Sequence, residues 1–274
     1  MYKRQRWGGM ALALLGPGVA LAALLTAGCG SSGSDPTARI MSINLSPNSG
    51  TSGVLVNGAA NGGDLNFGNS SPFNYIGQGL LTFGFSTGAT LPTTGTAPVS
   101  PSLQFNNGSS YTTILIGRAD TPSLADARYL QTIAIGDKGA AANYTGGVSY
   151  SDPPSGQANV RIINAAPDAG YTAPNPGAVD VLVNGQAAFS NVSYPAFPKP
   201  VNTGDTSGPA VTPAPPYQAF PAGTLSVQVN VAKSVTVLVP PTNVSVSAGK
   251  SYTIVVTEPT VTPTYGLYTA SDQP

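Results

Sequence analysis

Apolar residues occupy every second position in several stretches of this chain, and this spacing constrains the fold more than any other feature. The clearest stretches are residues 179–183, 225–229 and 252–256. A period of two places the apolar side chains on one face of a half-buried strand, whereas an amphipathic helix needs a spacing of about 3.6 residues. We therefore expect an all-β protein, with at most one short helical turn at residues 121–126.

A five-residue motif, Val-Leu-Val-Asn-Gly, occurs at residues 54–58 and again at residues 181–185. In both places an Ile-Asn pair precedes it and a Ser-Tyr-Thr segment follows it, in the same order. Because Asn-Gly tolerates the two positive φ values of a type I′ turn, each motif predicts a strand that runs into a β-hairpin. Three landmarks in the same order indicate two homologous copies of one domain.

Short strands with frequent turn signals are typical of antiparallel β-sandwiches, so we expect two tandem, immunoglobulin-like sandwiches. A stretch rich in Gly, Ser and Pro between the copies predicts a linker. The expected organisation is a signal peptide at 1–28, an acylated cysteine and flexible tether at 29–37, a divergent first domain at 38–145, a linker at 146–157 and a second domain at 158–270.

Four motifs follow one another in the second copy: RIINAAPDAG, AVDVLVNGQAAFSNVSY, FPAGTLSVQV and VSAGKSYTIVV. This part of the chain resembles the bacterial domain-of-unknown-function family numbered 4397. The first copy departs from that pattern, because Gly53 corresponds to Asp180 and the Pro-Ala-Gly-Thr motif is missing. The resemblance implies a secreted or surface-anchored protein with β-sandwich domains, without an established activity and without a catalytic residue to carry over.

Cys29 is the only cysteine of the chain and follows Leu-Thr-Ala-Gly at residues 25–28. A basic leader and an apolar run precede this motif, and together they indicate an export signal. The motif resembles the bacterial lipobox, in which the cysteine receives diacylglycerol and becomes the new N-terminus; the alternative is an ordinary secretory signal with a chance cysteine. We expect Cys29 to anchor the protein to a membrane of the cell envelope. Because Gly30 follows it, we prefer the outer membrane in a cell that has two.

The chain has no histidine, and this excludes Ser-His-Asp and Cys-His catalysis and removes the usual zinc ligands. Basic and acidic residues number 11 each, so charge provides no reason to expect a nucleic acid as partner. We therefore expect a non-catalytic structural or binding module that uses no cofactor. A polysaccharide-acting hydrolase is the less favoured alternative, because no pair of acids stands out by its placement.

The second copy carries two insertions, one near residues 171–177 and a proline-rich one at 194–220. If the chain reverses direction at each connection, both insertions lie at one end of the domain, where such folds usually place binding surfaces. We predict that this end contacts an envelope glycan or protein; the alternative is that its rings fold back to cap the core. The predicted contact residues are Tyr171, Tyr194, Phe197, Tyr217 and Phe220.

Asp168 and Asp180 flank one loop, and calcium prefers several such hard oxygen ligands. Only these two acids lie nearby, however, so we favour a structural role for both and expect no metal. In that interpretation Asp168 caps the turn after Pro167 and Asp180 points outward from its strand.

Overall fold

The computed structural model confirms the expected all-β class. It describes residues 37–89, 102–105, 107–121, 123, 126, 128–136, 152–170, 177–194, 216–258 and 264–272, which all belong to one compact unit, residues 36–274. Within these ranges every regular element is a β-strand. The part of the chain so described contains no helix that could cross a membrane.

The described residues form sixteen strands, which follow one another in chain order. They are β1 (Thr37–Asn44), β2 (Val54–Val56), β3 (Ala59–Ala60), β4 (Asn74–Gly77), β5 (Gly79–Phe85), β6 (Ser102–Phe105), β7 (Ser110–Ile116), β8 (Gln131–Gly136), β9 (Gln157–Asn164), β10 (Ala178–Val183), β11 (Gln186–Ser193), β12 (Gln218–Pro221), β13 (Gly223–Val231), β14 (Val237–Val246), β15 (Ser251–Thr257) and β16 (Gly266–Ser271).

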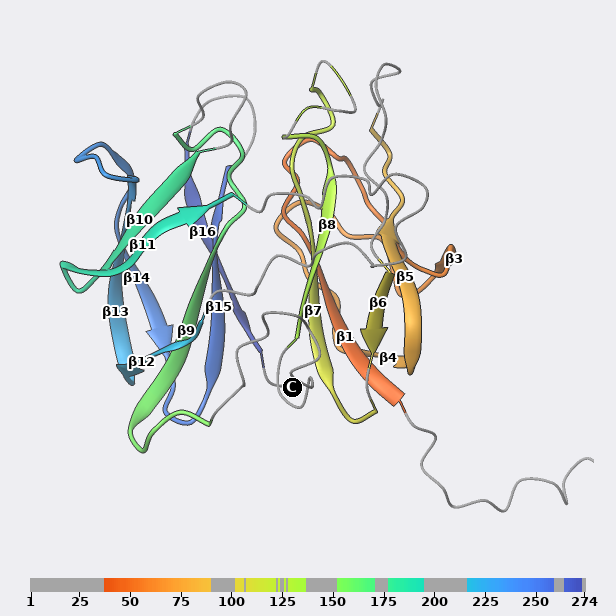
Figure 1. Cartoon of the computed structure of the whole chain (residues 1–274), viewed down its shortest axis with the longest axis horizontal. Coiled ribbons are helices and arrows are strands. Elements are labelled where there is room, and N and C mark those ends of the chain that lie inside the picture. The colour runs from red at the N-terminus through yellow and green to blue at the C-terminus, as the bar shows by residue number, and fades with distance from the viewer. Residues whose placement is uncertain are drawn as a thin grey trace, which may run out of the picture. The chain divides into compact units, whose positions relative to one another are not determined.

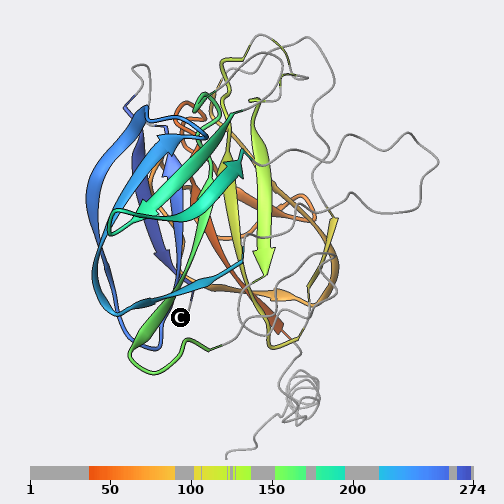
Figure 2. The same cartoon turned by 60° about the vertical axis from the view of Figure 1, so that its left-hand side comes forward.

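The strands form four sheets, and the two copies have the same strand order. The first copy contains the sheets β4-β1-β7-β8 and β3-β2-β5-β6, and the second contains β12-β9-β15-β16 and β11-β10-β13-β14. One pair in each copy is parallel, β1 with β7 and β9 with β15, which departs from the purely antiparallel expectation. Figures 1 and 2 show β9 and β15 side by side. The paired strands lie far apart in the sequence, as a parallel pair requires, because the chain must cross over between them.

The Asn-Gly turns have the predicted conformation in both copies. Asn57 and Gly58 have φ values of 50° and 77°, and Asn184 and Gly185 have values of 52° and 76°. Positive φ at both central residues is the signature of a type I′ turn. These turns set the register of the β2–β3 and β10–β11 hairpins.

Each copy has its own apolar core. In the second copy, Val160 and Ile162 of β9 belong to one buried cluster with Val181 of β10 and Val227 of β13, so residues from two sheets share this core. In the first copy, Ile40 of β1 belongs to the corresponding cluster with Val54 of β2. The period-two expectation is confirmed for β10 and β13, where buried and less buried residues alternate.

A third buried cluster contains residues from both copies. Ile43 of β1 and Ile114 of β7 pack there with Ile163 of β9 and Val255 of β15. Consequently β7 is buried along its whole length, and β15 is buried at every position except Tyr252. The expectation that residues 252–256 form a half-buried strand is therefore wrong, because the other copy covers the second face of β15.

The short helical turn expected at residues 121–126 falls largely outside the described residues, because only 121, 123 and 126 of that segment are described, so it stays a prediction. The backbone N–H of Asp126 donates to the carbonyl of Ser123 at 3.1 Å.

Candidate functional site

The sequence-predicted site residues fall into two groups. Three lie outside the described residues, and their roles stay predictions: Cys29, Tyr171 and Phe197. The structure describes the other three: Tyr194, Tyr217 and Phe220.

Tyr194 lies directly after β11, where the longer insertion begins. Its backbone N–H donates to the carbonyl of Gly177 at 3.1 Å, so the beginning of the longer insertion lies beside the end of the shorter one, as the sequence predicted. The Tyr194 side chain is only 1% exposed and packs in the cluster that contains Ile163 and Val255. Burial raises the pKa of its phenol. This ring is therefore part of the core between the copies rather than an exposed contact.

Tyr217 lies over a buried arginine. The centroid of its ring is 4.8 Å from Cζ of Arg161, and its hydroxyl donates to Asp272 Oδ2 at 2.7 Å. Arg161 Nε donates to Thr253 Oγ1 at 2.7 Å, and Arg161 Nη2 lies 3.6 Å from Asp272 Oδ2. Thr253 Oγ1 in turn donates to Asp272 Oδ1 at 2.6 Å. These side chains form one connected polar network, which holds the half-buried Tyr217 ring in place.

Phe220 belongs to β12, where it pairs with Ala158 of β9. Its ring packs against Phe189 with a distance of 6.2 Å between ring centroids, and both rings lie at the core of the second copy. Of the three described rings of the predicted site, Tyr194 and Phe220 thus pack against different buried clusters and Tyr217 lies in the polar network around Arg161, so the three do not gather at one surface. For Tyr194 and Phe220 the structure favours the alternative that the rings cover the core.

A cluster of charged side chains joins the two copies, and Asp168 lies at its centre. One of its oxygens, Oδ2, lies 3.3 Å from Arg118 Nη1, and the other, Oδ1, lies 3.0 Å from Arg128 Nη1. Both arginines come from the first copy, on the segment between β7 and β8. Asp168 follows β9 in the second copy, so its carboxylate bridges the copies through two guanidinium groups.

The remaining carboxylates of this cluster also form ion pairs or hydrogen bonds. Arg118 pairs with Asp120 through two nitrogens at 2.9 Å each and with Glu258 Oε1 at 2.7 Å. Arg128 pairs with Asp126 through two nitrogens at 3.0 Å each. The backbone N–H of Asp168 donates to Glu258 Oε2 at 3.1 Å.

Burial and neighbouring charges shift the proton affinities within the cluster. Hydrogen bonds from Arg118 hold the pKa of Asp120 below its usual range, and Arg128 does the same for the pKa of Asp126. Burial raises the pKa of Glu258, and the nearby charge of Asp168 raises it further. Each described carboxylate of the cluster is engaged by an arginine or by backbone.

Asp168 and Asp180 have separate partners and do not converge. Asp168 faces two arginines, whose charges oppose the binding of a cation. Asp180 Oδ1 accepts the backbone N–H of Asn191 and Oδ2 accepts that of Lys233, both at 2.7 Å. Among the residues that the structure describes, no three His, Cys, Asp or Glu side chains gather in a way that could hold a metal ion.

Sequence reasoning missed the arginines that organise both networks. Arg161 stands between Val160 and Ile162 in an apolar strand, and a charged residue in such a place signals a buried, paired group. Arg118 and Arg128 gave no comparable signal, because the sequence shows only their nearby partners Asp120 and Asp126, whereas Asp168, which both contact, comes from the other copy. The contacts between copies are encoded by residues that lie far apart along the chain.

No protein-family model matches the chain, and no curated protein matches it either.

Proposed function

We propose that this chain is a lipid-anchored protein of the bacterial cell envelope that acts as a non-catalytic structural or binding module. The observation that carries the proposal is the single cysteine, Cys29, which follows Leu-Thr-Ala-Gly and a basic, apolar leader. In this proposal the leader is removed, the thiol carries diacylglycerol, and the modified residue holds the protein on the outer membrane where the cell has one. The membrane is then its first partner, and an envelope glycan or protein is the second.

The compact unit is proposed to be two immunoglobulin-like β-sandwich domains related to the domain-of-unknown-function family numbered 4397. Two features support this: the copies share their strand order, and each has a buried cluster to which two sheets contribute. In a sandwich the residues of two facing sheets form the core in the same way.

A non-catalytic role is supported by the arginine contacts that engage the carboxylates of the charged cluster. A glycoside hydrolase needs one carboxyl group that can give up a proton and a second that remains free to act on the sugar or on water. Asp168 and Glu258 are neighbouring acids of this cluster, and both are held by Arg118. This leaves the proposed role as support or recognition rather than hydrolysis.

Mass spectrometry of the protein isolated from its own cell tests the anchor. We expect a mature chain that begins at Cys29 and carries a diacylglyceryl group with or without a further acyl chain. A Cys29→Ser variant should lose the lipid mass and the membrane fraction, whereas Ser31→Ala, its matched control, should keep both. A free Cys29 thiol or an attached leader in the wild-type protein would refute the proposal.

Binding to envelope material tests the second part of the proposal. The purified protein is incubated with isolated envelope polysaccharide and the released sugars are measured. We expect retention of the polysaccharide or no interaction, and no release of reducing sugar. Release that disappears in a Glu258→Gln variant would show a hydrolase and would exclude the non-catalytic role.

A further inference from the structure

The proposed anchor reaches the first copy at one defined end. The first strand, β1, begins at Thr37, eight residues after Cys29, so the chain between these two residues spans at most about 29 Å. Thr37 pairs with Gly77, where the chain leaves β4 and enters β5 through Gln78. A lipid on Cys29 therefore keeps this end of the first copy, residues 77–79, within that distance of the membrane surface.

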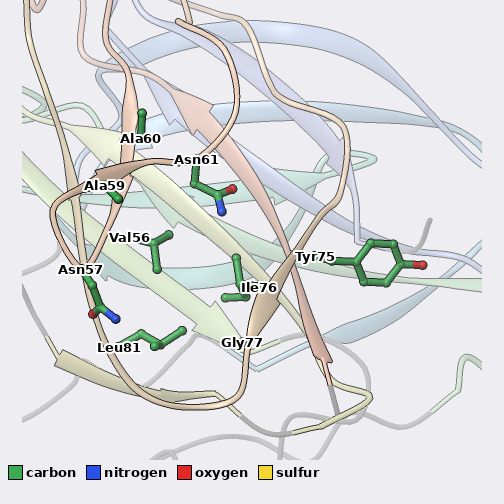
Figure 3. A pocket seen from close by; sticks show the side chains of 9 residues that line it. All are labelled: Val56, Asn57, Ala59, Ala60, Asn61, Tyr75, Ile76, Gly77 and Leu81. Atoms are coloured by element: carbon green, nitrogen blue, oxygen red, sulfur yellow. The ribbon is translucent and has the colours of Figure 1, made fainter. Parts of the chain in front are cut away.

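Two large apolar side chains are exposed at this end. Tyr75 of β4 is 69% exposed and Leu80 of β5 is 68% exposed. Their neighbours Ile76 and Leu81 face the core of the first copy, so Tyr75 and Leu80 lie on the outer faces of two different sheets. Figure 3 shows the Tyr75 ring directed away from Ile76 and Leu81, which line the pocket between these sheets. Tyr75 and Leu80 thus flank residues 77–79 on two sides.

A basic side chain accompanies Tyr75. Arg39 of β1 pairs with Tyr75, so both side chains lie on the same face of their sheet. Arg39 Nη2 donates to Ser110 Oγ at 3.2 Å, which holds the guanidinium beside the beginning of β7. The described segments at this end are residues 37–40, 74–80, 103–105, 107–112 and 134–136. Arg39 is the one charged residue in these segments, so they contain no acid that would repel a negatively charged surface.

The second copy has different side chains at the equivalent positions. The shared strand order, the register of β4 with β1 and the register of β12 with β9 give the correspondence. Arg39, Tyr75 and Leu80 of the first copy correspond to Asn159, Ala219 and Thr224 of the second. The fold therefore does not require a basic, an aromatic and a large aliphatic side chain at these positions. The copy that directly follows the anchor is the one that carries them.

We infer that this end of the first copy docks on the lipid surface to which Cys29 is anchored, with Tyr75 and Leu80 in the headgroup layer. The inference rests on the proposed anchor and adds a defined contact surface to it. Both residues lie within two residues of the ends of their strands, which is about 7 Å at the usual rise of a strand. The headgroup layer on each side of the hydrocarbon is about 5–7 Å deep, so both side chains reach it when this end meets the membrane.

The chemistry of the three side chains suits a lipid surface. Tyrosine is enriched at membrane–water interfaces, because its ring is apolar and its hydroxyl is polar. Arg39 brings a positive charge that attracts the phosphates of anionic lipids. The short connection to Cys29 makes the contact intramolecular, at an effective concentration in the millimolar range, so a few side chains are sufficient for docking.

A single tryptophan reporter tests the docking. The only tryptophan of the chain is Trp7, in the leader, so residues 29–274 contain none. This mature chain is coupled through the Cys29 thiol to a maleimide lipid, in vesicles of equal parts phosphatidylethanolamine and phosphatidylglycerol. We expect the emission of a Gln78→Trp reporter to shift to shorter wavelength and to be quenched by lipids brominated near the top of their acyl chains. The matched control, Val235→Trp, replaces a side chain that is 93% exposed in the second copy and should show neither effect.

A double variant tests the residues. Tyr75→Ala with Leu80→Thr gives the first copy the residues of the second, and it should lower the docking equilibrium of the Gln78→Trp reporter by at least about tenfold, because the buried apolar area is lost. The control pair, Val235→Ser with Val237→Thr, removes two other exposed apolar side chains and should leave docking unchanged. If the double variant does not fold, Leu80→Thr alone is compared with Val237→Thr.

The outcomes separate the docking surface from the anchor. The inference is overturned if the coupled Gln78→Trp reporter keeps the emission of the uncoupled chain, or if the control pair lowers docking as much as the Tyr75 and Leu80 pair. Coupling through maleimide makes both results independent of whether the cell attaches a lipid. The anchor itself is judged by the mass of the native protein, so a free Cys29 thiol would refute the anchor and not the affinity of this end for lipid.

Discussion

At the scale of single residues, the most consequential group is the buried guanidinium of Arg161. In the first copy the same register position holds Met41, since Met41 pairs with Thr112 as Arg161 pairs with Thr253. We expect Arg161→Met to cost about 3–5 kcal/mol of unfolding free energy, because the carboxylate of Asp272, 0% exposed, would lose the charge that faces it. Urea unfolding at neutral pH measures this cost.

The double variant Arg161→Met with Asp272→Asn provides the control for that prediction. Removing both charges should recover a large part of the loss, because a buried ion pair replaced by neutral groups is often tolerated. Lys250→Met, which removes an exposed charge, should change stability little. Equal stabilities of Arg161→Met and the wild type would contradict the account of a compensated buried charge.

At the scale of elements, the two Asn-Gly hairpins rely on the same contacts. Asn184 Oδ1 accepts the backbone N–H of Ser226 at 2.9 Å, and Asn57 Oδ1 accepts that of Thr82 at 2.8 Å. Substituting either asparagine by alanine removes this hydrogen bond, and the alanine must then adopt the positive φ without it. We expect each variant to lose about 1–2 kcal/mol, measured by thermal or urea unfolding. Gln186→Ala, beside the second turn, should have almost no effect, and an equal loss there would contradict the prediction.

The same elements show what could be predicted from the sequence. The hairpins and the alternating strands β10 and β13 were predictable because their signals lie within a few adjacent residues. The second buried face of β15 was not, because it depends on contacts with residues such as Ile43 and Ile114, which come from the other copy. Likewise the aromatic insertion suggested an exposed surface, yet Tyr194 belongs to the shared core. Local patterns do not indicate which side chains a distant strand will cover.

At the scale of the whole molecule, the charged cluster makes stability depend on pH. The pKa values of Asp120 and Asp126 lie below the usual range of an aspartate, because Arg118 and Arg128 donate hydrogen bonds to them, so their ionised forms stabilise the folded chain. This stabilisation is present above the unfolded-state pKa and is lost as the pH falls through the folded-state values. The pKa of Glu258 is shifted upward from 4.5, so its protonation favours the folded state and opposes a loss of stability at mildly acidic pH.

We therefore expect little loss of stability between pH 7 and pH 5 and a clear decline below about pH 4. Asp126→Asn should lower stability at pH 7 by no more than about 1 kcal/mol, because solvent screens a partly exposed pair, and this difference should disappear at the lowest pH. Urea unfolding at a series of pH values measures both effects, with Asp64→Asn as an exposed control outside the cluster. The plots of unfolding free energy against pH for Asp126→Asn and the wild type could instead stay parallel into the acid range. In that case ionisation of Asp126 would not contribute to joining the copies, and the apolar cluster around Ile163 and Val255 would hold them together without it.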